Sequence, residues 1–493
     1  MTEELKNNLE IALEKRARHL EATKADGRQL VSIRKIDDLI PIPGADRIIT
    51  AQIGGWPCVV KNNEFVPGEL GLYFEPDSFL DAEDPRYAFL ADGKIEWKGV
   101  EGIRLKAIKL RKQLSQGLLL PLSLFPEIAQ LSSDGKTYFI TIPDDNDEGT
   151  KVETTIPRFA DPASDEYEYV KKLNFTTHLG VIKWEKIEKS SGGANLAGKS
   201  SGTFPPFLRK SDQPRCQNMA REIFGYEARE VPMDPDMQAA MPQEAIDSLI
   251  AEGRARMDGD TLVRIFPPAA DPEERFEVTM KMDGSSMTTY TLLVRDADGV
   301  DRYKFGVCSR NQELQAQDLT DLTAENGFTT FEPGARYENE GNAFVDTFRS
   351  KVLPIIRMLP QNIALQGELL GPGIQGDYEK VGEKTGEYVF MVYNVFDIDQ
   401  EVNLLPGDRR ALIENLNDMA AHSLLGLRIQ EVPVQAWNVR LSDLGITNMQ
   451  ELLAYAEGPG LYQPIREGFV FKSMTRNEFQ FKAISNAYEL KKG

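Results

Sequence analysis

The sequence has few cysteines and few histidines. Its 493 residues contain three of each. Cys58, Cys216 and Cys308 lie far apart, so their spacing fits neither a disulfide framework nor a zinc knuckle, and we expect buried free thiols. No carboxylate pattern around the three histidines indicates metal ligation or a Ser-His triad. Any catalysis should therefore depend on lysines and carboxylates.

The sequence also lacks a long apolar run. No stretch of about eighteen uncharged apolar residues offers a membrane span, which excludes a membrane enzyme. Residues 1–30 mix acids and bases at helical spacing without an apolar segment, so they do not form a signal peptide. With 41% hydrophobic and 27% charged residues, the composition is that of a globular protein, and we expect a cytoplasmic location.

The charge balance is acidic. Lys and Arg number 57 and Asp and Glu 77, a formal net charge of −20, which argues against a protein that coats nucleic acid non-specifically. One region is basic, since residues 94–112 contain seven Lys or Arg and two Glu. If IRLKAIKLRK is a strand, alternation places Arg104 and Lys106 on one face. Two interpretations remain open: a stripe that follows phosphates, and a solvated strand edge.

The pattern of apolar residues and turns divides the chain into segments. Residues 1–29 predict an amphipathic helix, and residues 30–125 contain short β-rich runs separated by Pro-Gly and Gly-Gly turns, which is typical of an OB-fold barrel. We expect residues 126–180 to be an acidic linker or insertion. The second domain should occupy residues 181–493, with an insertion at about 232–272 that contains a short helix.

Two glycine-rich segments match nucleotide-binding patterns. Residues 193–200 have the G-x-x-x-x-G-K-S spacing of a P-loop, and residues 389–397 form an apolar run that ends in Asp. The sequence after Lys199 is Ser-Gly-Thr-Phe-Pro-Pro, which cannot begin the helix that a P-loop requires. A P-loop nucleotide triphosphatase is therefore kept only as an alternative. The segment GPGIQG, residues 371–376, is better explained as a loop that leaves a strand.

The run VTMKMDGSSMTTY carries the most informative chemistry. Lys281 stands at the end of an apolar strand pattern, and Asp283 and Gly284 form the turn that follows. A lysine at the mouth of a sheet becomes a nucleophile if its pKa is lowered. Taken alone, this short motif favours a surface hairpin with a solvated lysine.

Further motifs follow in a fixed order. They are CSRNQEL with Arg310 and Asn311, LQGELLGPGIQ with Glu368, EYVFMVYNVFDI with Tyr393 and Phe396, REGFVFKS with Glu467 and Lys472, and FQFKAIS with Lys482. Together with Lys281 the series resembles motifs I, Ia, III, IIIa, IV and V of the covalent nucleotidyltransferases. It resembles in particular the ATP-dependent RNA ligases of family 5. The resemblance implies an α+β fold: an N-terminal OB-fold β-barrel, then an ATP-grasp-like nucleotidyltransferase domain of antiparallel sheets flanked by helices.

The resemblance implies a role for each motif. Lys281 would attack the α-phosphate of ATP and form a lysyl-AMP adduct. Lys472 and Lys482 would hold the α-phosphate, and their charge would lower the pKa of Lys281. Arg310 would contact the ribose and the incoming 5′-phosphate, and Phe396 would stack on adenine.

The carboxylates complete the implied site. Asp283, Glu368 and Glu467 would bind Mg²⁺ or Mn²⁺, with Glu368 also contacting the nucleotide and Glu467 also acting in catalysis. Two positions depart from the family pattern. Many relatives carry a lysine where this chain has Gln480, and some carry an acid where it has Met280. The departures affect the detail of the phosphate and adenine contacts.

The resemblance implies an ATP-dependent RNA ligase that joins 3′-OH and 5′-phosphate ends, acting on nicks in duplexes with RNA on the 3′-OH side. We expect a monomer that binds a nicked RNA or RNA/DNA duplex and no membrane. DNA ligases and capping guanylyltransferases normally carry the OB domain after motif V, and this chain ends eleven residues past Lys482, so both are weaker alternatives. A non-catalytic OB-domain protein that binds nucleic acid is a further alternative.

Overall fold

The computed structural model describes most of the chain. The described ranges are 28–142, 153–161, 164–185, 200–233, 235–295, 299, 301–316, 341–358, 361–374, 387–461 and 463–492. The expected helix over residues 1–29 lies almost entirely outside them. No helix within these ranges is long and apolar enough to cross a membrane. The chain divides into two units: residues 1–186, 227–269 and 490–493 form the first, and residues 187–226 and 270–489 form the second.

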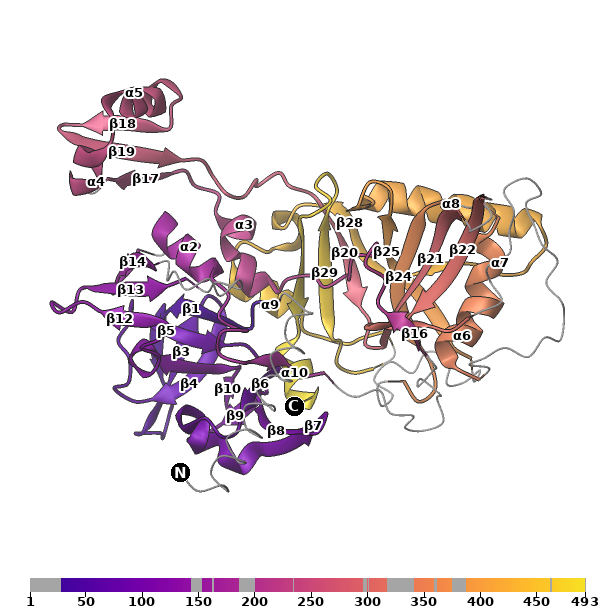
Figure 1. Cartoon of the computed structure of the whole chain (residues 1–493), viewed down its shortest axis with the longest axis horizontal. Helices are drawn as coiled ribbons and strands as arrows, with labels where there is room; N and C mark the ends of the chain where they lie inside the picture. Colours follow the sequence, from indigo (N-terminus) through magenta and orange to yellow (C-terminus); the bar gives the residue numbers. More distant parts are fainter. Residues whose placement is uncertain are drawn as a thin grey trace. The chain divides into compact units, whose positions relative to one another are not determined.

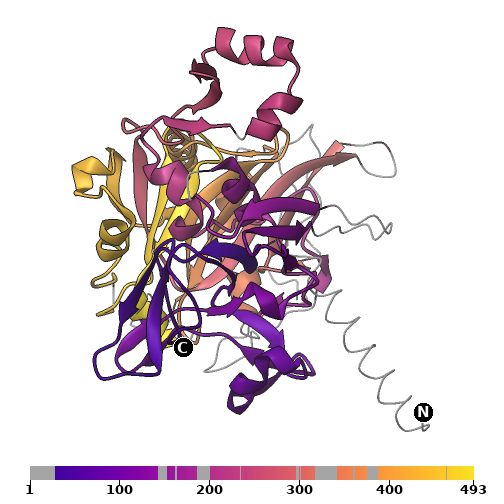
Figure 2. The ribbon, with the colours of Figure 1, turned by 90° about the vertical axis from the view of Figure 1, so that its left-hand side faces the viewer.

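The first unit is built from short antiparallel strands (Figures 1 and 2). Its sheets are β1(Val31–Lys35)-β5(Leu70–Phe74)-β11(Leu118–Pro121), β2(Asp38–Pro41)-β3(Ile48–Ile53)-β4(Trp56–Lys61), β15(Ile182–Lys183)-β6(Ser78–Asp81)-β8(Val100–Arg104)-β7(Lys94–Trp97), β10(Gln113–Ser115)-β9(Ile108–Leu110) and β12(Ala129–Leu131)-β13(Thr137–Thr141)-β14(Glu153–Pro157). The helical segments among them are η1(Pro85–Gly93), η2(Leu122–Leu124) and α2(Asp165–Lys172). The many short strands agree with the small β-barrel predicted for this part of the chain.

The described part of the predicted acidic linker is folded. β13 and β14 supply Ile140 and Ile156 to the core that also contains Phe74 and Phe125, and α2 supplies Val170. Burial of these apolar side chains is the reason that the segment does not behave as a solvated linker. Of the two predicted alternatives for residues 126–180, a linker or an insertion, the described part therefore does not fit a linker, because it shares one core with residues before 126.

The predicted insertion forms a small α/β element. Strands β17(Arg229–Pro232), β19(Thr261–Phe266) and β18(Ala255–Asp258) pair in that order, beside helices α4(Pro235–Ala240) and α5(Gln243–Ala251). Ile246, Ala255 and Leu262 form its core. The short helix expected in this insertion is confirmed as α5.

The basic run does not form one continuous strand. β8 ends at Arg104, and β9 begins only at Ile108 and pairs with β10. Arg111 and Lys112 form the turn between β9 and β10, with φ angles of 51° and 69°. The predicted single face of alternating bases is therefore wrong, and the bases of residues 109–112 instead stand on an exposed hairpin.

The second unit contains two sheets. The larger, eight-stranded sheet has the order β16(Ser200–Thr203)-β23(Gln312–Leu314)-β22(Asp301–Cys308)-β21(Ser285–Arg295)-β24(Ile363–Leu370)-β25(Val389–Asp397)-β26(Val402–Asn403), with β27(Gln430–Glu431) beside β25. The smaller sheet has the order β28(Val434–Val439)-β20(Phe276–Lys281)-β29(Gly468–Ser473)-β30(Gln480–Ile484). The helical segments are η3(Cys216–Met219), α3(Ala220–Phe224), α6(Ala343–Thr347), η5(Phe348–Val352), α7(Leu353–Ile356), α8(Pro406–His422), η7(Ser442–Leu444), α9(Met449–Tyr455) and α10(Asn486–Lys492). All described pairings between its strands are antiparallel except the pairing of β25 with β27, and an isolated parallel bridge joins Arg215 to Lys482.

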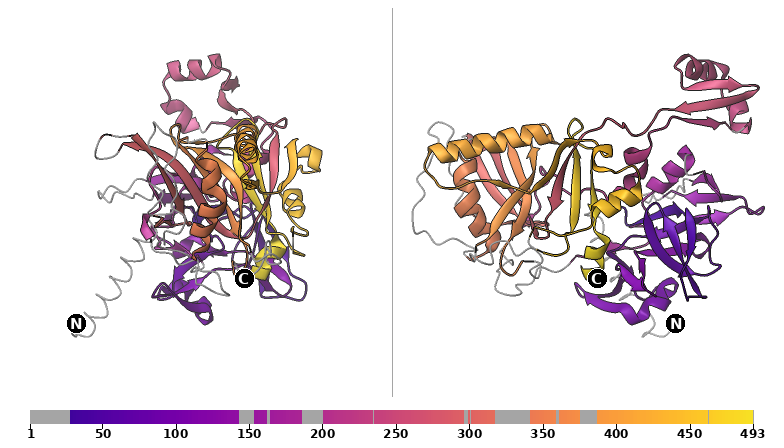
Figure 3. Two further views of the ribbon diagram at one scale, coloured as in Figure 1. Left: turned by 90° about the vertical axis from the view of Figure 1, so that its right-hand side faces the viewer. Right: turned by 180° about the vertical axis from the view of Figure 1, so that it is seen from behind.

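Helices α6, α7 and α8 cover one face of the larger sheet (Figures 1 and 3). Their core contains Phe344, Ile355 and Ile413 from the helices and Leu365 and Val392 from the sheet. The opposite face of β24 and β25 carries the predicted site residues Glu368 and Phe396, since successive side chains of a strand alternate between faces.

The strand that begins at Ser200 rules out the P-loop interpretation. A P-loop requires a helix directly after its Lys and Ser, so that the first N–H groups of that helix bind the phosphates. Residues 200–203 are instead strand β16, paired with β23. The three cysteines are free and buried, as predicted.

Candidate active site

The two faces of the smaller sheet differ sharply in chemistry. Phe276, Val278, Phe471 and Phe481 point into an apolar core. Glu277, Thr279 and Lys281 on β20 alternate with these residues and lie on the other face. The pairing register places Gly468, Val470 and Lys472 of β29, and Gln480, Lys482 and Ile484 of β30, on that same face. Three of the predicted lysines therefore share one surface of one sheet.

Lys281 lies at the end of β20, opposite Gly468. Its ammonium Nζ is 2.9 Å from Glu467 Oε1, and the Lys281 side chain is 25% exposed. Gly468 has a φ of 147°, and a Cβ at this position would come within 2.1 Å of the Ala483 carbonyl oxygen. Glycine is therefore required directly after Glu467, at the first position of β29.

The Asp-Gly turn after Lys281 contacts β24 of the larger sheet. The Gly284 N–H donates to Glu368 Oε1 at 3.1 Å. A Cβ on Gly284 would lie 2.4 Å from the Leu369 carbonyl oxygen, so only glycine allows this approach. Lys281, Asp283, Glu368 and Glu467 thus meet where the two sheets of the second unit come together.

The electrostatics of this cluster differ from the expectation. Burial lowers the pKa of Lys281, but the charges of Glu467, Glu368 and Asp283 outweigh it, so the pKa is raised above its usual value. Burial and the neighbouring carboxylates Glu467 and Asp283 raise the pKa of Glu368 to about 7 against the opposing charge of Lys281. The prediction that Lys472 and Lys482 lower the pKa of Lys281 is wrong for this arrangement, because carboxylates are the nearer charges.

The carboxylates near Lys281 have the chemistry of ligands for a hard cation, but they are not gathered into a complete metal site. Glu467 is 7% exposed, and its Oε2 is buried without a hydrogen-bond partner in the described part of the chain. Oxygen donors with surplus negative charge are the ligands that Mg²⁺ and Mn²⁺ prefer. Within the described ranges, however, no three acidic, histidine or cysteine side chains are gathered closely enough to form a metal site. The metal-binding role of Asp283, Glu368 and Glu467 stays a prediction.

Lys482 and Arg310 share one carboxylate. Lys482 Nζ donates to Asp212 Oδ1 at 2.6 Å, and Arg310 Nη2 lies 3.6 Å from Asp212 Oδ2. Asp212 thereby brings the two predicted phosphate-binding cations together. The side chain of Asn311 accepts from Lys210 Nζ at 3.0 Å.

The segment of residues 204–215 runs between the two sheets of the second unit. Gln366 Nε2 on β24 donates to the Arg209 carbonyl at 2.6 Å, and the Lys482 N–H on β30 donates to the Pro214 carbonyl at 2.9 Å. Ser211 bonds the Tyr393 hydroxyl at 2.8 Å. These contacts fix the backbone on both sides of Asp212.

Phe396 lies on the functional face of the larger sheet but is 2% exposed. It packs with Leu208, Tyr290 and Ala364, and the Arg209 Cζ lies 5.8 Å from its ring centroid. The ring is therefore part of a small apolar cluster, and stacking on adenine stays a prediction.

Lys472 lies on the face of the smaller sheet that also carries Lys281, but it contacts different partners. Its Nζ donates to the Tyr393 carbonyl and, at 3.3 Å, to Asn394 Oδ1. The side chain is buried, and burial, together with the charge of Arg409, lowers the pKa of Lys472 to about 7. A lysine in this state carries a charge that depends on pH near neutrality.

Lys472→Met is expected to remove a pH dependence of stability. The pKa of an unfolded lysine is about 10.4, and between pH 7 and this value the unfolded chain binds more protons than the folded chain, so the stability of the parent protein rises with pH. The variant lacks this rise. The melting temperature of the variant minus that of the parent should therefore be largest at about pH 7 and should decrease toward about pH 10. Thermal unfolding followed across this range checks it. A difference that stays constant with pH would contradict the lowered pKa.

Sequence reasoning missed three residues of this surface. Asp212 belongs to PPFLRKSDQPRCQN, which carries part of the family resemblance, but nothing in the segment marks one acid as a partner of lysine. Glu277 lies four residues before Lys281 on β20 and therefore on the same face, a signal that strand periodicity does contain. Arg409 lies on α8, and no local pattern connects it to the site.

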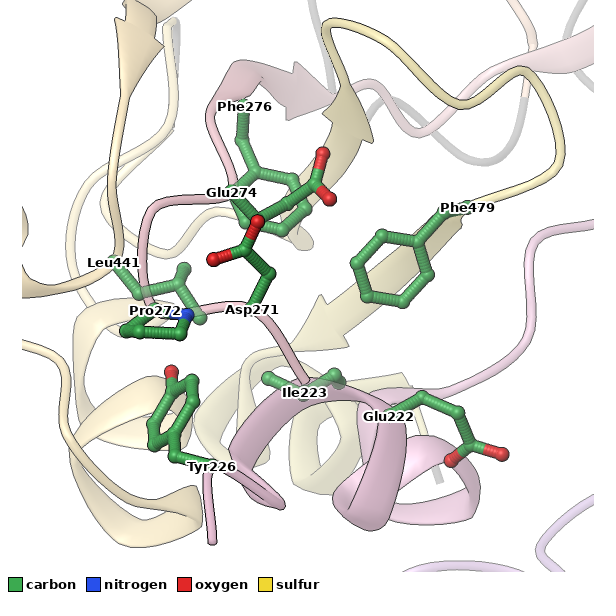
Figure 4. Close-up of a pocket in the computed structure, with 9 residues that line it drawn as sticks. All are labelled: Glu222, Ile223, Tyr226, Asp271, Pro272, Glu274, Phe276, Leu441 and Phe479. Atoms are coloured by element: carbon green, nitrogen blue, oxygen red, sulfur yellow. The ribbon is translucent and has the colours of Figure 1, made fainter. Parts of the chain in front are cut away.

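A hollow elsewhere in the second unit contains none of the predicted residues (Figure 4). It is lined by Glu222, Ile223, Tyr226, Asp271, Pro272, Glu274, Phe276, Leu441 and Phe479. Phe276 points to the face of β20 opposite to that of Lys281, so this hollow lies on the apolar side of the smaller sheet.

Comparisons with known proteins agree with this architecture. A family model described as an OB-fold domain matches residues 30–122, and one described as RNA ligase matches residues 274–484. A solved structure of a Naegleria gruberi RNA ligase variant with AMP and Mn is 31% identical, covers 94% of this chain and 99% of its own, and has a TM-score of 0.61. The same enzyme with PPi is 31% identical over 94% of this chain and 98% of its own, with a TM-score of 0.61.

A comparison with curated proteins gave no match. The architecture of this chain is thus an OB-fold domain followed by a ligase domain, as the sequence predicted. The chain belongs to the RNA ligase family.

Proposed function

We propose that this chain seals 3′-OH and 5′-phosphate ends with ATP through a lysyl-AMP intermediate, and that its substrates are nicks in duplexes with RNA on the 3′-OH side. One observation carries the proposal. Lys281 ends a strand within an RNA ligase domain, and its ammonium pairs with Glu467 beside Glu368 and Asp283. Solved structures of the Naegleria relative with ATP and Mn support the choice of nucleotide and of Mg²⁺ or Mn²⁺.

Three transfers make up the reaction. The Lys281 ammonium loses two protons as its nitrogen bonds to the α-phosphorus of ATP, and the bond to pyrophosphate breaks. The 5′-phosphate then takes AMP from the lysine. Finally, the 3′-hydroxyl attacks that phosphate, and AMP leaves. Each step is a phosphoryl transfer, in which the protein mainly positions groups and offsets charge.

The carboxylate cluster controls the nucleophile. When bound, a divalent cation would offset the charge of the carboxylates and of the ATP phosphates. Without the full carboxylate charge, burial becomes the dominant influence, and burial lowers the pKa of Lys281. Glu467 would orient the amine, since its Oε1 already contacts Nζ. Lys472, Lys482 and Arg310 would neutralise the phosphates from the same face.

The nucleotide that labels the chain covalently distinguishes this function from the alternatives. The chain is incubated with radiolabelled ATP or GTP and Mg²⁺ or Mn²⁺, and covalent label is measured. Label from ATP supports the ligase, label only from GTP supports a capping guanylyltransferase, and no label supports a non-catalytic OB-domain protein. Sealing of nicks with RNA or DNA on the 3′-OH side then distinguishes an RNA ligase from a DNA ligase.

The basic hairpin of the first unit is the surface that we assign to duplex binding. β9 and β10 present Lys109, Arg111 and Lys112 to solvent, beside Ile108 and Leu110, which are 45% and 37% exposed. Cations on an exposed ribbon suit a phosphate backbone, and the OB-fold supports this role.

The triple variant Lys109→Gln, Arg111→Gln and Lys112→Gln is expected to seal nicks more slowly while retaining self-adenylylation. Each lost phosphate contact should reduce the slope of log affinity against log salt by about 0.9 on duplex DNA. Duplex binding measured over a salt series checks the slope. Lys136→Gln, at an exposed turn of the same unit, is the matched control. An unchanged slope in the triple variant would place the duplex elsewhere.

A further inference from the structure

A buried ion pair lies next to Lys472. Arg409 of α8 is 1% exposed and Glu277 of β20 is 0% exposed. The guanidinium contacts both carboxylate oxygens, Nη1 to Oε2 at 2.9 Å and Nη2 to Oε1 at 2.6 Å. Arg409 Nε donates to Glu431 Oε1 at 2.9 Å. Such a bidentate pair fixes the position of both groups.

The register of the smaller sheet makes this pair relevant to Lys472. Glu277 is the residue directly opposite Lys472 in the pairing of β20 with β29. Cross-strand neighbours of opposite charge on one face normally pair with each other. Here the Lys472 ammonium donates to the Tyr393 carbonyl and to Asn394 instead. Both oxygens of Glu277 accept from Arg409.

Arg409 also reaches the acceptor of Lys472. Its Nη1 lies 3.4 Å from the Tyr393 carbonyl oxygen, the atom to which Lys472 donates. Two cations therefore converge on one carbonyl group of β25. The guanidinium repels the ammonium, and it neutralises the carboxylate that would otherwise attract it.

We propose that Arg409 is a positioning residue for the ligase reaction, which holds Glu277 in a bidentate pair and thereby keeps the Lys472 ammonium available to a nucleotide phosphate. The inference rests on the phosphate contact of Lys472 in the proposed function. Arg409 itself touches no reacting atom. It acts indirectly, by keeping the Glu277 carboxylate from pairing with Lys472.

Stability alone does not explain the buried pair of Arg409 and Glu277. Burying two charges removes their hydration, and neutral side chains of similar size often replace such a pair without loss of stability. Removing only one partner leaves an uncompensated charge, which is strongly destabilising. In this site the uncompensated charge left by loss of Arg409 would be Glu277, and Lys472 is the cation opposite it.

The test compares Arg409→Met with the double variant Glu277→Gln and Arg409→Met. The single variant leaves Glu277 free to capture Lys472, so kcat/KM for self-adenylylation with ATP should fall by about tenfold or more. The double variant has neither charge, so it should recover to within about threefold of the parent. Arg440→Met, which breaks an exposed ion pair of the same unit, is the matched control.

The pH profile separates positioning from a structural role. The groups that face Lys472 are Glu277 on β20, Arg409 on α8, Glu431 on β27 and the Tyr393 ring on β25, 5.7 Å from Nζ. Loss of Arg409 removes a charge that repels the Lys472 ammonium and leaves Glu277 without its partner, and both changes raise the pKa of Lys472. The alkaline limb of kcat/KM should therefore move to higher pH by about one unit or more. A purely structural role would lower the amount of folded protein and leave the limb in place.

Two results would overturn the inference. One is an Arg409→Met variant with the parent's alkaline limb, and the other is a double variant no better than the single one. If Arg409→Met does not fold, the double variant and Arg409→Lys still test the inference. Arg409→Lys keeps the positive charge but loses the bidentate geometry, so its activity should lie between that of the parent and that of a variant without the charge. A parent protein without any adenylate adduct would refute the proposed function instead, so the two failures are distinguishable.

Discussion

Lys281→Ala is expected to abolish the covalent adenylate adduct. The proposed reaction forms a bond between the Lys281 nitrogen and the α-phosphorus of ATP, and alanine has no nucleophile to offer. Intact-mass spectrometry after incubation with ATP and Mg²⁺ or Mn²⁺ should show one added adenylate on the parent chain and none on the variant. Sealing of nicks should fall to the background level, since the 5′-phosphate receives its AMP only from the adduct.

Two control variants sharpen this result. Lys281→Arg keeps the charge beside Glu467 but stays protonated at all accessible pH values, so it should also form no adduct. Lys199→Ala removes the lysine of the P-loop-like sequence, which lies outside the described residues, and should retain the parent's adduct. An adduct that survives Lys281→Ala and disappears with Lys199→Ala would refute the assignment.

Glu467→Gln is expected to slow adenylylation by about 10²-fold or more, because a neutral amide of the same size weakens the charge-assisted contact that orients the Lys281 amine. The same change removes one proposed metal ligand, so the concentration of Mn²⁺ needed for half-maximal activity should rise. Rates measured over a Mn²⁺ series check both effects. Direct binding of Mn²⁺ to the parent and to the variant checks the metal contact without reference to activity.

Glu478→Gln serves as the control for loss of an acid. Glu478 is 65% exposed and pairs with Arg209 on the surface, so its removal should leave the adenylylation rate within about twofold, as expected for exposed ion pairs. Equal rates for Glu467→Gln and the parent would show that Glu467 neither orients the lysine nor binds the metal. Glu368→Gln should resemble Glu467→Gln, because its carboxylate also faces Lys281.

Much of the fold was predictable because strand periodicity and turns are local. The β-rich runs and Pro-Gly turns of residues 30–125 predicted a small barrel, and a matching OB-fold family model covers residues 30–122. The alternation of β20 separates Phe276 from Lys281, as the strand pattern requires. The acidic linker was mispredicted because charge density dominated that segment, while buried residues such as Ile140 and Ile156 decide its packing.

The site was predictable only as a set of residue types in order. Lys281, Glu368 and Glu467 come from three distant segments, and the glycines that follow Asp283 and Glu467 lie where a Cβ would clash with a backbone carbonyl. The partners of these residues were not predictable. Asp212 binds Lys482, and Arg409 pairs with Glu277, through contacts between elements with no sequence relation.

The sequence alone determined which chemical groups this ligase carries and which strands they occupy, because each of these depends on neighbouring residues. Only the tertiary structure decided how the groups are charged and paired. Burial and the distances between charges set the pKa of Lys281, Glu368 and Lys472, and those distances exist only after the two sheets have packed.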